Sequence, residues 1–320
     1  SVLNFSLGNA YFSRAWCYFW IARIWGDAPL ALTGYESTAG DLYLPRAPKA
    51  EIFARIESDL TEAERYVTDN SDKAVATPAA VQMLKADYAL WMYRVAGGGS
   101  SYLTMAEEAI ETLNLSASRL ESDYAQVFSS ANKLNKEVIF AFSCLTEDGS
   151  SIKISNQFYS YNHPNKGSYN YRPAGDVMTM YADNDLRKEV SITTLDNLNF
   201  VNKYPSGQTG SDPVVISRLA EMYLISAEAQ GLNGGLDRLN ELREKRGLDR
   251  VSPGNEADFL DAVLQERRLE FLAEGFRWYD LVRTGKATQT LGTKDYQCLM
   301  PLPSRELLYN PNLKPNNPGY

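Results

Sequence analysis

Three glutamates, Glu266, Glu270 and Glu274, follow one another at four-residue spacing near the end of the chain. In a helix this spacing places the three carboxylates one turn apart on a single face. Two such groups could act as acid and nucleophile in a retaining glycosidase, which holds its carboxyls about 5–5.5 Å apart. The alternative is structural, because a column of like charges repels unless cations lie between them.

The cations needed for a structural role are present in the same segment. Arg267 lies three residues before Glu270, Arg277 lies three residues after Glu274, and Arg268 falls on the apolar stripe of the predicted helix. An arginine on a buried stripe needs a carboxylate partner. We therefore interpret the segment as an internal ion-pair lattice rather than a catalytic site, with Arg268 as a buried member. The structural signature comprises Glu266, Arg267, Arg268, Glu270, Glu274, Arg277 and Asp280.

A second group of residues has the composition of a carbohydrate-binding surface. Five aromatic residues fall in the segment 158–171, where the chain-wide aromatic content of 12% predicts fewer than two. Flat rings stack on the apolar face of a sugar, while amides and guanidinium groups bind its hydroxyls. The alternative is a tyrosine-rich loop that packs on its own scaffold. The candidate ligand-binding residues are Tyr159, Tyr161, Asn162, His163, Tyr169, Tyr171 and Arg172.

Other kinds of catalytic or cofactor site have little support. His163 is the only histidine, so a multi-histidine metal site is excluded, and its neighbours Asn162 and Pro164 predict a turn rather than a catalytic relay. The three cysteines, Cys17, Cys144 and Cys298, lie far apart and have no metal-ligand spacing. One disulfide is possible, and Cys17 is expected to be buried among aromatic residues. We expect no metal, no cofactor and no catalytic residue.

The composition is that of a folded globular chain. It has 320 residues, 44% of them hydrophobic and 22% charged, which is enough for one large core or two smaller ones. The net charge of −8 argues against nucleic acid, whose binding requires clustered Lys and Arg. No apolar run approaches the roughly 20 residues of a membrane-spanning helix.

The elements that would position these residues are mostly helical. Paired helices with alanines at their crossings predict a mainly α, tetratricopeptide-like scaffold, with short strands near 137–142 and 190–194 in an irregular, loop-rich insertion. The helix pairs are predicted at 8–25 with 49–68, 78–96 with 102–115, 214–230 with 235–247, and 256–274 with 277–284. The expected organisation is 1–116 for the first two pairs, 117–212 for the insertion and candidate ligand-binding region, and 213–320 for the last two pairs.

Three blocks of sequence together resemble one protein family. The segment 266–286 contains Arg277-Trp-Tyr-Asp-Leu281 after a glycine, the segment 10–30 ends in Trp25-Gly-Asp-Ala-Pro-Leu30, and the chain closes with 299–320, which begins Leu-Met-Pro-Leu-Pro-Ser. These blocks are similar, in the same order, to the first repeat helix and the C-terminal signatures of the SusD/RagB family.

This resemblance implies a surface-exposed outer-membrane lipoprotein without catalytic activity. Such a protein captures oligosaccharide and passes it to a SusC-like, TonB-dependent transporter, and it contacts the membrane only through an N-terminal lipid anchor. Family members carry a signal peptide, a lipidated cysteine and a further segment ahead of the first helix, and we expect that segment to be absent from this chain. Two alternatives within the family are capture of peptides in the RagB manner and a structural transporter lid without ligand contact.

Overall fold

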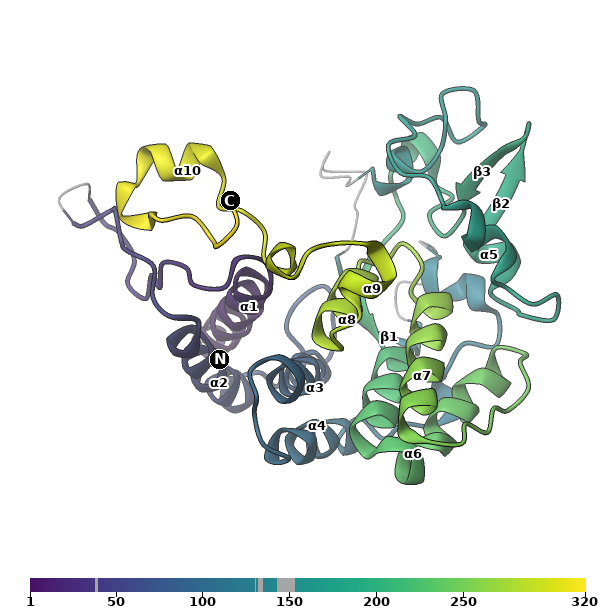
Figure 1. Ribbon diagram of the computed structural model, residues 1–320. Helices are drawn as coiled ribbons and strands as arrows, with labels where there is room; N and C mark the ends of the chain where they lie inside the picture. The colour runs from purple at the N-terminus through teal and green to yellow at the C-terminus, as the bar shows by residue number, and fades with distance from the viewer. Residues whose placement is uncertain (38–39, 130, 132–134, 143–152) are drawn as a thin grey trace. The chain divides into compact units, whose positions relative to one another are not determined.

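The computed structural model describes residues 1–37, 40–129, 131, 135–142 and 153–320, and most of them are helical (Figure 1). The mainly α architecture with few short strands agrees with the sequence analysis.

The chain forms two compact units. One unit contains residues 1–69 together with 278–320, and the other contains residues 70–277. This division differs from the three consecutive segments that the sequence predicts, 1–116, 117–212 and 213–320. The C-terminal part of the chain belongs to the same unit as the first helix pair.

The first unit is built on the helix pair α1 (Val2–Trp25) and α2 (Lys49–Tyr66). Asn317 fastens the C-terminal segment to this pair: its amide donates to Trp25 O (3.0 Å) and Met300 O (2.7 Å), and its carbonyl accepts from Arg46. The remaining helices here are short. They are α8 (Arg277–Arg283), α9 (Ala287–Leu291) and α10 (Ser304–Tyr309).

The second unit contains the other long helices. As predicted, α3 (Pro78–Val95) begins at Pro78, and Thr77 caps it by accepting a hydrogen bond from Ala80 N at 3.1 Å. It pairs with α4 (Ser101–Glu111), and α6 (Leu219–Lys245) pairs with α7 (Glu256–Glu270). This arrangement confirms a helix-pair scaffold and the first two predicted pairs. The third predicted pair forms the two halves of α6, and the fourth is wrong, because α7 pairs with α6.

The break in α6 falls between the two helices predicted at 214–230 and 235–247. The residue with non-helical dihedral angles is Gly231 (φ 67°, ψ −172°). The helix restarts beside α7, where the carboxylate of Glu256 accepts a hydrogen bond from Leu232 N at 3.0 Å. Gly235 has another role, since a Cβ there would lie 2.0 Å from Ala227 O.

The insertion contains two small antiparallel sheets. The predicted strand near 137–142 is β1 (Val138–Phe142), and its partner is β4 (Val214–Arg218). We predicted helix from residue 214, which is wrong because the β-branched run Val214-Val-Ile pairs with β1 before α6 begins. The second sheet is a hairpin of β2 (Ile192–Leu195) and β3 (Leu198–Val201), preceded by the one-turn helix α5 (Lys188–Ser191).

A fully buried ion-pair lattice joins α7 to the rest of this unit. The carboxylate of Glu270 forms ion pairs with Arg187 Nη1 (2.8 Å), Arg246 Nη2 (2.8 Å) and Arg218. Glu137 is shared by Arg218 (2.9 Å) and Arg246 (2.6 Å). Burial alone would raise the pKa of Glu270, but the charges of Arg246, Arg218 and Arg187 hold it well below its ordinary value.

The lattice uses the predicted glutamates but takes its cations from other elements. Glu266 binds Arg187 (2.6 Å) and Arg243 (2.6 Å). Glu274 binds Lys203 at 2.6 Å and Arg218 at 2.9 Å. These four cations and Arg246 come from the insertion, from the end of β4 and from the end of α6.

The predicted roles of the neighbouring arginines are wrong in part. Arg268 is not a buried partner of the glutamates: it is partly exposed and pairs with the exposed Asp176. Arg267 is buried, and its guanidinium lies 5.1 Å from the ring of Phe271. Arg277 donates to Leu264 O, and Asp280 pairs with Arg283 at 3.0 Å.

Two further expectations concern the cysteines and the membrane. Cys17 is exposed rather than buried, because it lies on the outward face of α1 while Tyr18 and Phe19 turn inward. Cys17 and Cys298 are free thiols, and Cys144 lies outside the described residues. Within the described ranges, none of the helices combines the length and apolar character that crossing a bilayer requires.

We predict that Glu270→Gln destabilises the protein by about 3–5 kcal/mol, because it leaves three buried arginines short of one negative charge. Arg268→Ala is the matched control and should cost no more than about 1 kcal/mol, since its ion pair is exposed. Chemical denaturation of both variants measures the difference. Equal losses in the two variants would contradict a lattice centred on Glu270.

Candidate functional site

The tyrosine-rich segment, residues 156–172, folds back on itself and is called the tyrosine loop below. Three backbone bonds hold it closed: Ser168 N donates to Asn156 O (2.7 Å), Tyr169 N to Tyr159 O (3.1 Å) and Tyr171 N to Gln157 O (3.0 Å). These bonds require close approach at Gly167, where a Cβ would lie 2.3 Å from Tyr159 O. The loop therefore has a defined shape.

One side of the tyrosine loop packs against β3. Tyr159 is fully buried, its ring stacks on Phe200 at 5.8 Å, and its hydroxyl donates to Asn202 Oδ1 at 2.8 Å. Burial raises the pKa of Tyr159 to about 12. The prediction that this ring is available to a ligand is therefore wrong, because β3 covers it.

Two other candidate residues are only partly accessible. The ring of His163 lies 4.3 Å from that of Tyr159, its Nδ1 accepts from Asn165 N at 3.0 Å, and burial lowers its pKa. Tyr169 is half-buried and donates its hydroxyl to Asn199 O at 2.6 Å. The exposed guanidinium of Arg172 lies 4.6 Å from the Tyr169 ring.

The other side of the tyrosine loop presents two open rings. Tyr161 is 78% exposed and Tyr171 is 63% exposed, and the ring of Tyr171 lies 6.2 Å from that of the buried Phe158. An amide pair accompanies them, since Asn170 Nδ2 donates to Gln157 Oε1 at 2.8 Å. Asn162 is exposed as well. Exposed rings with amides beside them match the chemistry expected of a sugar-binding surface.

A pocket of about 430 Å³ lies in the same part of the chain and is called the Asp212 pocket below. Asn202 links it to the tyrosine loop, because its side chain lines the pocket and accepts the hydrogen bond from Tyr159. Sequence reasoning missed this pocket, since its lining comes from separate segments. The lining residues that matter are Gln126, Phe128, Ser129, Glu189, Val190, Asn202, Lys203, Pro205, Ser206 and Asp212.

Two charged groups of the Asp212 pocket have shifted pKa values. Burial lowers the pKa of Lys203 to about 8, although its ammonium lies 2.6 Å from Glu274 Oε1. Burial raises the pKa of Asp212, and hydrogen bonds from Ser206 N (3.1 Å) and the Ser206 hydroxyl partly offset that effect.

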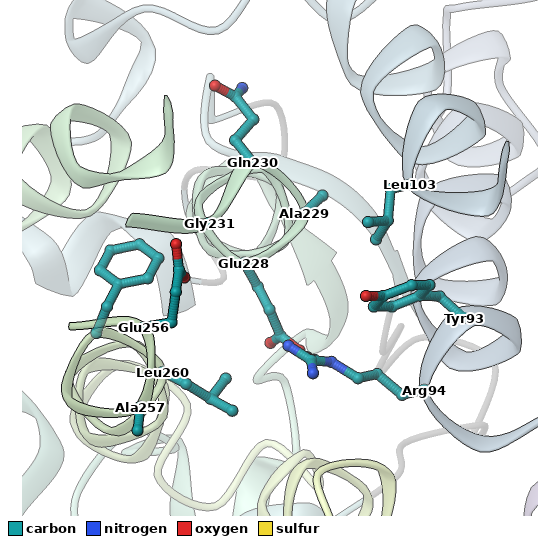
Figure 2. A pocket seen from close by; sticks show the side chains of 11 residues that line it. Tyr93, Arg94, Leu103, Glu228, Ala229, Gln230, Gly231, Glu256, Ala257 and Leu260 are labelled. Atoms are coloured by element: carbon teal, nitrogen blue, oxygen red, sulfur yellow. Dashed lines mark hydrogen bonds and ion pairs between the residues drawn. The ribbon is translucent and has the colours of Figure 1, made fainter. Parts of the chain in front are cut away.

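A further concavity of about 450 Å³ lies among the scaffold helices α3, α4, α6 and α7. Figure 2 shows Tyr93 and Leu103 on one side of it, with the side chains of Arg94 and Glu228 close together. These two groups form an ion pair (Nε–Oε1 2.9 Å) that ties α3 to α6. The pair is explained by packing between the helices.

Comparison with known proteins gives two matches to family models. Residues 155–298 match the model of the SusD family, and residues 4–93 match a model described as starch-binding associating with outer membrane.

The chain belongs to the SusD/RagB family.

Individual relatives of this SusD/RagB chain support the assignment. SusD-like protein P38 of Formosa agariphila is 27% identical, over 98% of this chain and 73% of the relative. The solved structure of B. fragilis NanU is 27% identical with a TM-score of 0.83, covering 99% of this chain and 78% of NanU. A laminarin-binding SusD-like protein, at 22% identity, shares the fold with a TM-score of 0.79 over 98% of this chain and 79% of its own.

We predict that Gly167→Ala disrupts the tyrosine loop. The new Cβ would meet two backbone carbonyl oxygens, of Tyr159 and Asn156, which cannot move without breaking the loop's hydrogen bonds. Overpacking of this kind costs about 1–3 kcal/mol. Limited proteolysis should cut the variant within residues 156–172 faster than the parent. Gly175→Ala is the control, since a Cβ there meets nothing within 4 Å. Equal cleavage of both variants would contradict the required close approach.

Proposed function

We propose that this protein is a non-catalytic glycan-binding protein of the cell surface. The observation that carries the proposal is the pair of open rings, Tyr161 and Tyr171, on a loop whose opposite side is held by β3. A rigid loop presents its rings without an ordering cost on binding, which favours affinity for an extended sugar chain. The family model described as starch-binding and the laminarin-binding structural relative support this ligand class.

Binding rather than hydrolysis is favoured by the state of the acidic residues. The side chains of Glu266, Glu270 and Glu274 are inaccessible, and each carboxylate binds at least two cations. A glycosidase needs one carboxyl poised to give up a proton and one poised to attack, both in contact with the sugar. The three glutamates meet none of these requirements.

Membership of the family supports a proposal for where this activity takes place. We propose that the protein is lipid-anchored at the outer membrane and delivers bound oligosaccharide to a SusC-like, TonB-dependent transporter. A description of one matching family model as associating with outer membrane supports the location.

We predict that replacing Tyr161 and Tyr171 with alanine abolishes retention of the protein by its glycan. Each stacked ring contributes about 1–3 kcal/mol, so the loss of both is large for a weak sugar site. Affinity electrophoresis in gels containing laminarin, starch or other polysaccharides measures retention. The melting temperature should stay unchanged, because both rings are exposed.

The matched control is Tyr159→Phe, which removes the buried hydroxyl bond to Asn202 and leaves both open rings in place. This variant should melt earlier and still be retained. Retention of the Tyr161/Tyr171 variant on a polysaccharide that binds the parent would place the glycan elsewhere.

A further inference from the structure

The Asp212 pocket offers negative charge to a ligand but no free positive charge. Glu189 and Asp212 both line it, and in the described ranges neither forms an ion pair with a lysine or arginine. Lys203 is the cation of the lining, and its ammonium is already held by Glu274 Oε1 at 2.6 Å and Glu270 O at 2.7 Å. A ligand in this pocket therefore meets two carboxylates.

Of the two carboxylates, that of Asp212 is the more buried and has the greater need of a counter-charge. It is only 3% exposed, and the hydrogen bonds to it come from neutral donors, Ser206 N and the Ser206 hydroxyl. A carboxylate removed from water without a counter-charge costs free energy, which a cation placed beside it would offset. Glu189 is exposed and lines the same pocket from the α5 side.

The remaining walls indicate what kind of cation fits. Phe128, Val190 and Pro205 form apolar surface, while Gln126 and Ser129 supply an amide and a hydroxyl. The amide of Asn202 is already bound to Tyr159 and to Glu189 O. A volume of about 430 Å³ is that of a small-molecule site and accepts one sugar ring with room to spare. Among the residues that the structure describes, no group of three acidic, histidine or cysteine side chains could hold a metal ion. An organic cation suits the pocket better.

We propose that the Asp212 pocket binds an amino-sugar residue with a free, protonated amine, and that Asp212 and Glu189 accept its ammonium hydrogens. The Gln126 amide and the Ser129 hydroxyl bind the ring hydroxyls, and the apolar wall contacts the ring carbons. This inference rests on the proposed function, since the ligand is taken to be a glycan. It adds a second site, which selects for a free amine.

The test compares two probes built on the same four sugar rings: a glucosamine tetramer, whose amines are protonated, and its fully N-acetylated, uncharged counterpart. Isothermal titration of the full chain, in buffer that keeps the amines protonated, should give about tenfold or greater preference for the glucosamine tetramer, since a buried charge pair is lost on acetylation. Glu189→Gln and Asp212→Asn should each remove most of that preference. Asp196→Asn is the control: it removes one exposed acid from the neighbouring β2–β3 turn and should leave the preference intact.

The outcomes separate this inference from the proposed function. Equal binding of both tetramers, abolished by replacing Tyr161 and Tyr171, would overturn the amine site and leave glycan capture standing. A preference that survives Glu189→Gln, whose side chain is exposed and whose change should not affect folding, would also overturn it. Competition by a lysine-containing peptide as effective as glucosamine would reject a sugar as the occupant. Absence of binding by any glycan, with or without amines, would count against the proposed function itself.

Discussion

The architecture of residues 70–277 depends on the charges gathered around Glu270. Arginines from three places in the chain, Arg187, Arg218 and Arg246, meet this one carboxylate out of contact with water. Buried ions carry a large desolvation cost, so such a lattice holds only when each charge has its partners in place. The insertion, the end of β4 and the end of α6 must therefore reach their positions together. Helix α7 is therefore the element on which the insertion, β4 and α6 meet.

Contacts with this lattice position the two candidate ligand surfaces, the tyrosine loop and the Asp212 pocket. Lys203 joins Glu274 and directly follows Asn202, whose side chain receives the hydroxyl of Tyr159. Tyr159 in turn holds the buried side of the tyrosine loop against β3, so the open rings of Tyr161 and Tyr171 face outward. A continuous set of contacts therefore runs from the scaffold helix to the exposed rings. This explains how a loop rich in small polar residues keeps one shape.

The sequence predicted much of the scaffold and the composition of the site, but not its internal arrangement. Helix starts such as Pro78 carry local signals, and the glutamate column could be identified as structural from its spacing together with the arginines in the same segment. Its partners could not, because Arg187 and Arg218 lie far away in sequence and only the fold brings them near. In the tyrosine loop, composition indicated a binding surface, yet which rings open to solvent depends on β3 beneath them. The Asp212 pocket could not be recognised in the sequence, because its walls come from separate segments between residues 125 and 212.

The cations that tie the insertion to the glutamates also affect how ligand preference can change on this scaffold. Arg187 and Lys203 act as two anchor points: Glu266 and Glu270 of α7 hold Arg187, and Glu274, which follows that helix, holds Lys203. We expect the exposed β2–β3 turn between these anchors to accept changes of length or sequence without disturbing the scaffold, as long as the anchors keep their charge. A repertoire of ligand preferences can then arise on one architecture by replacement of surface segments. An engineer could graft a foreign recognition loop at the same place by retaining those two cations as its boundaries.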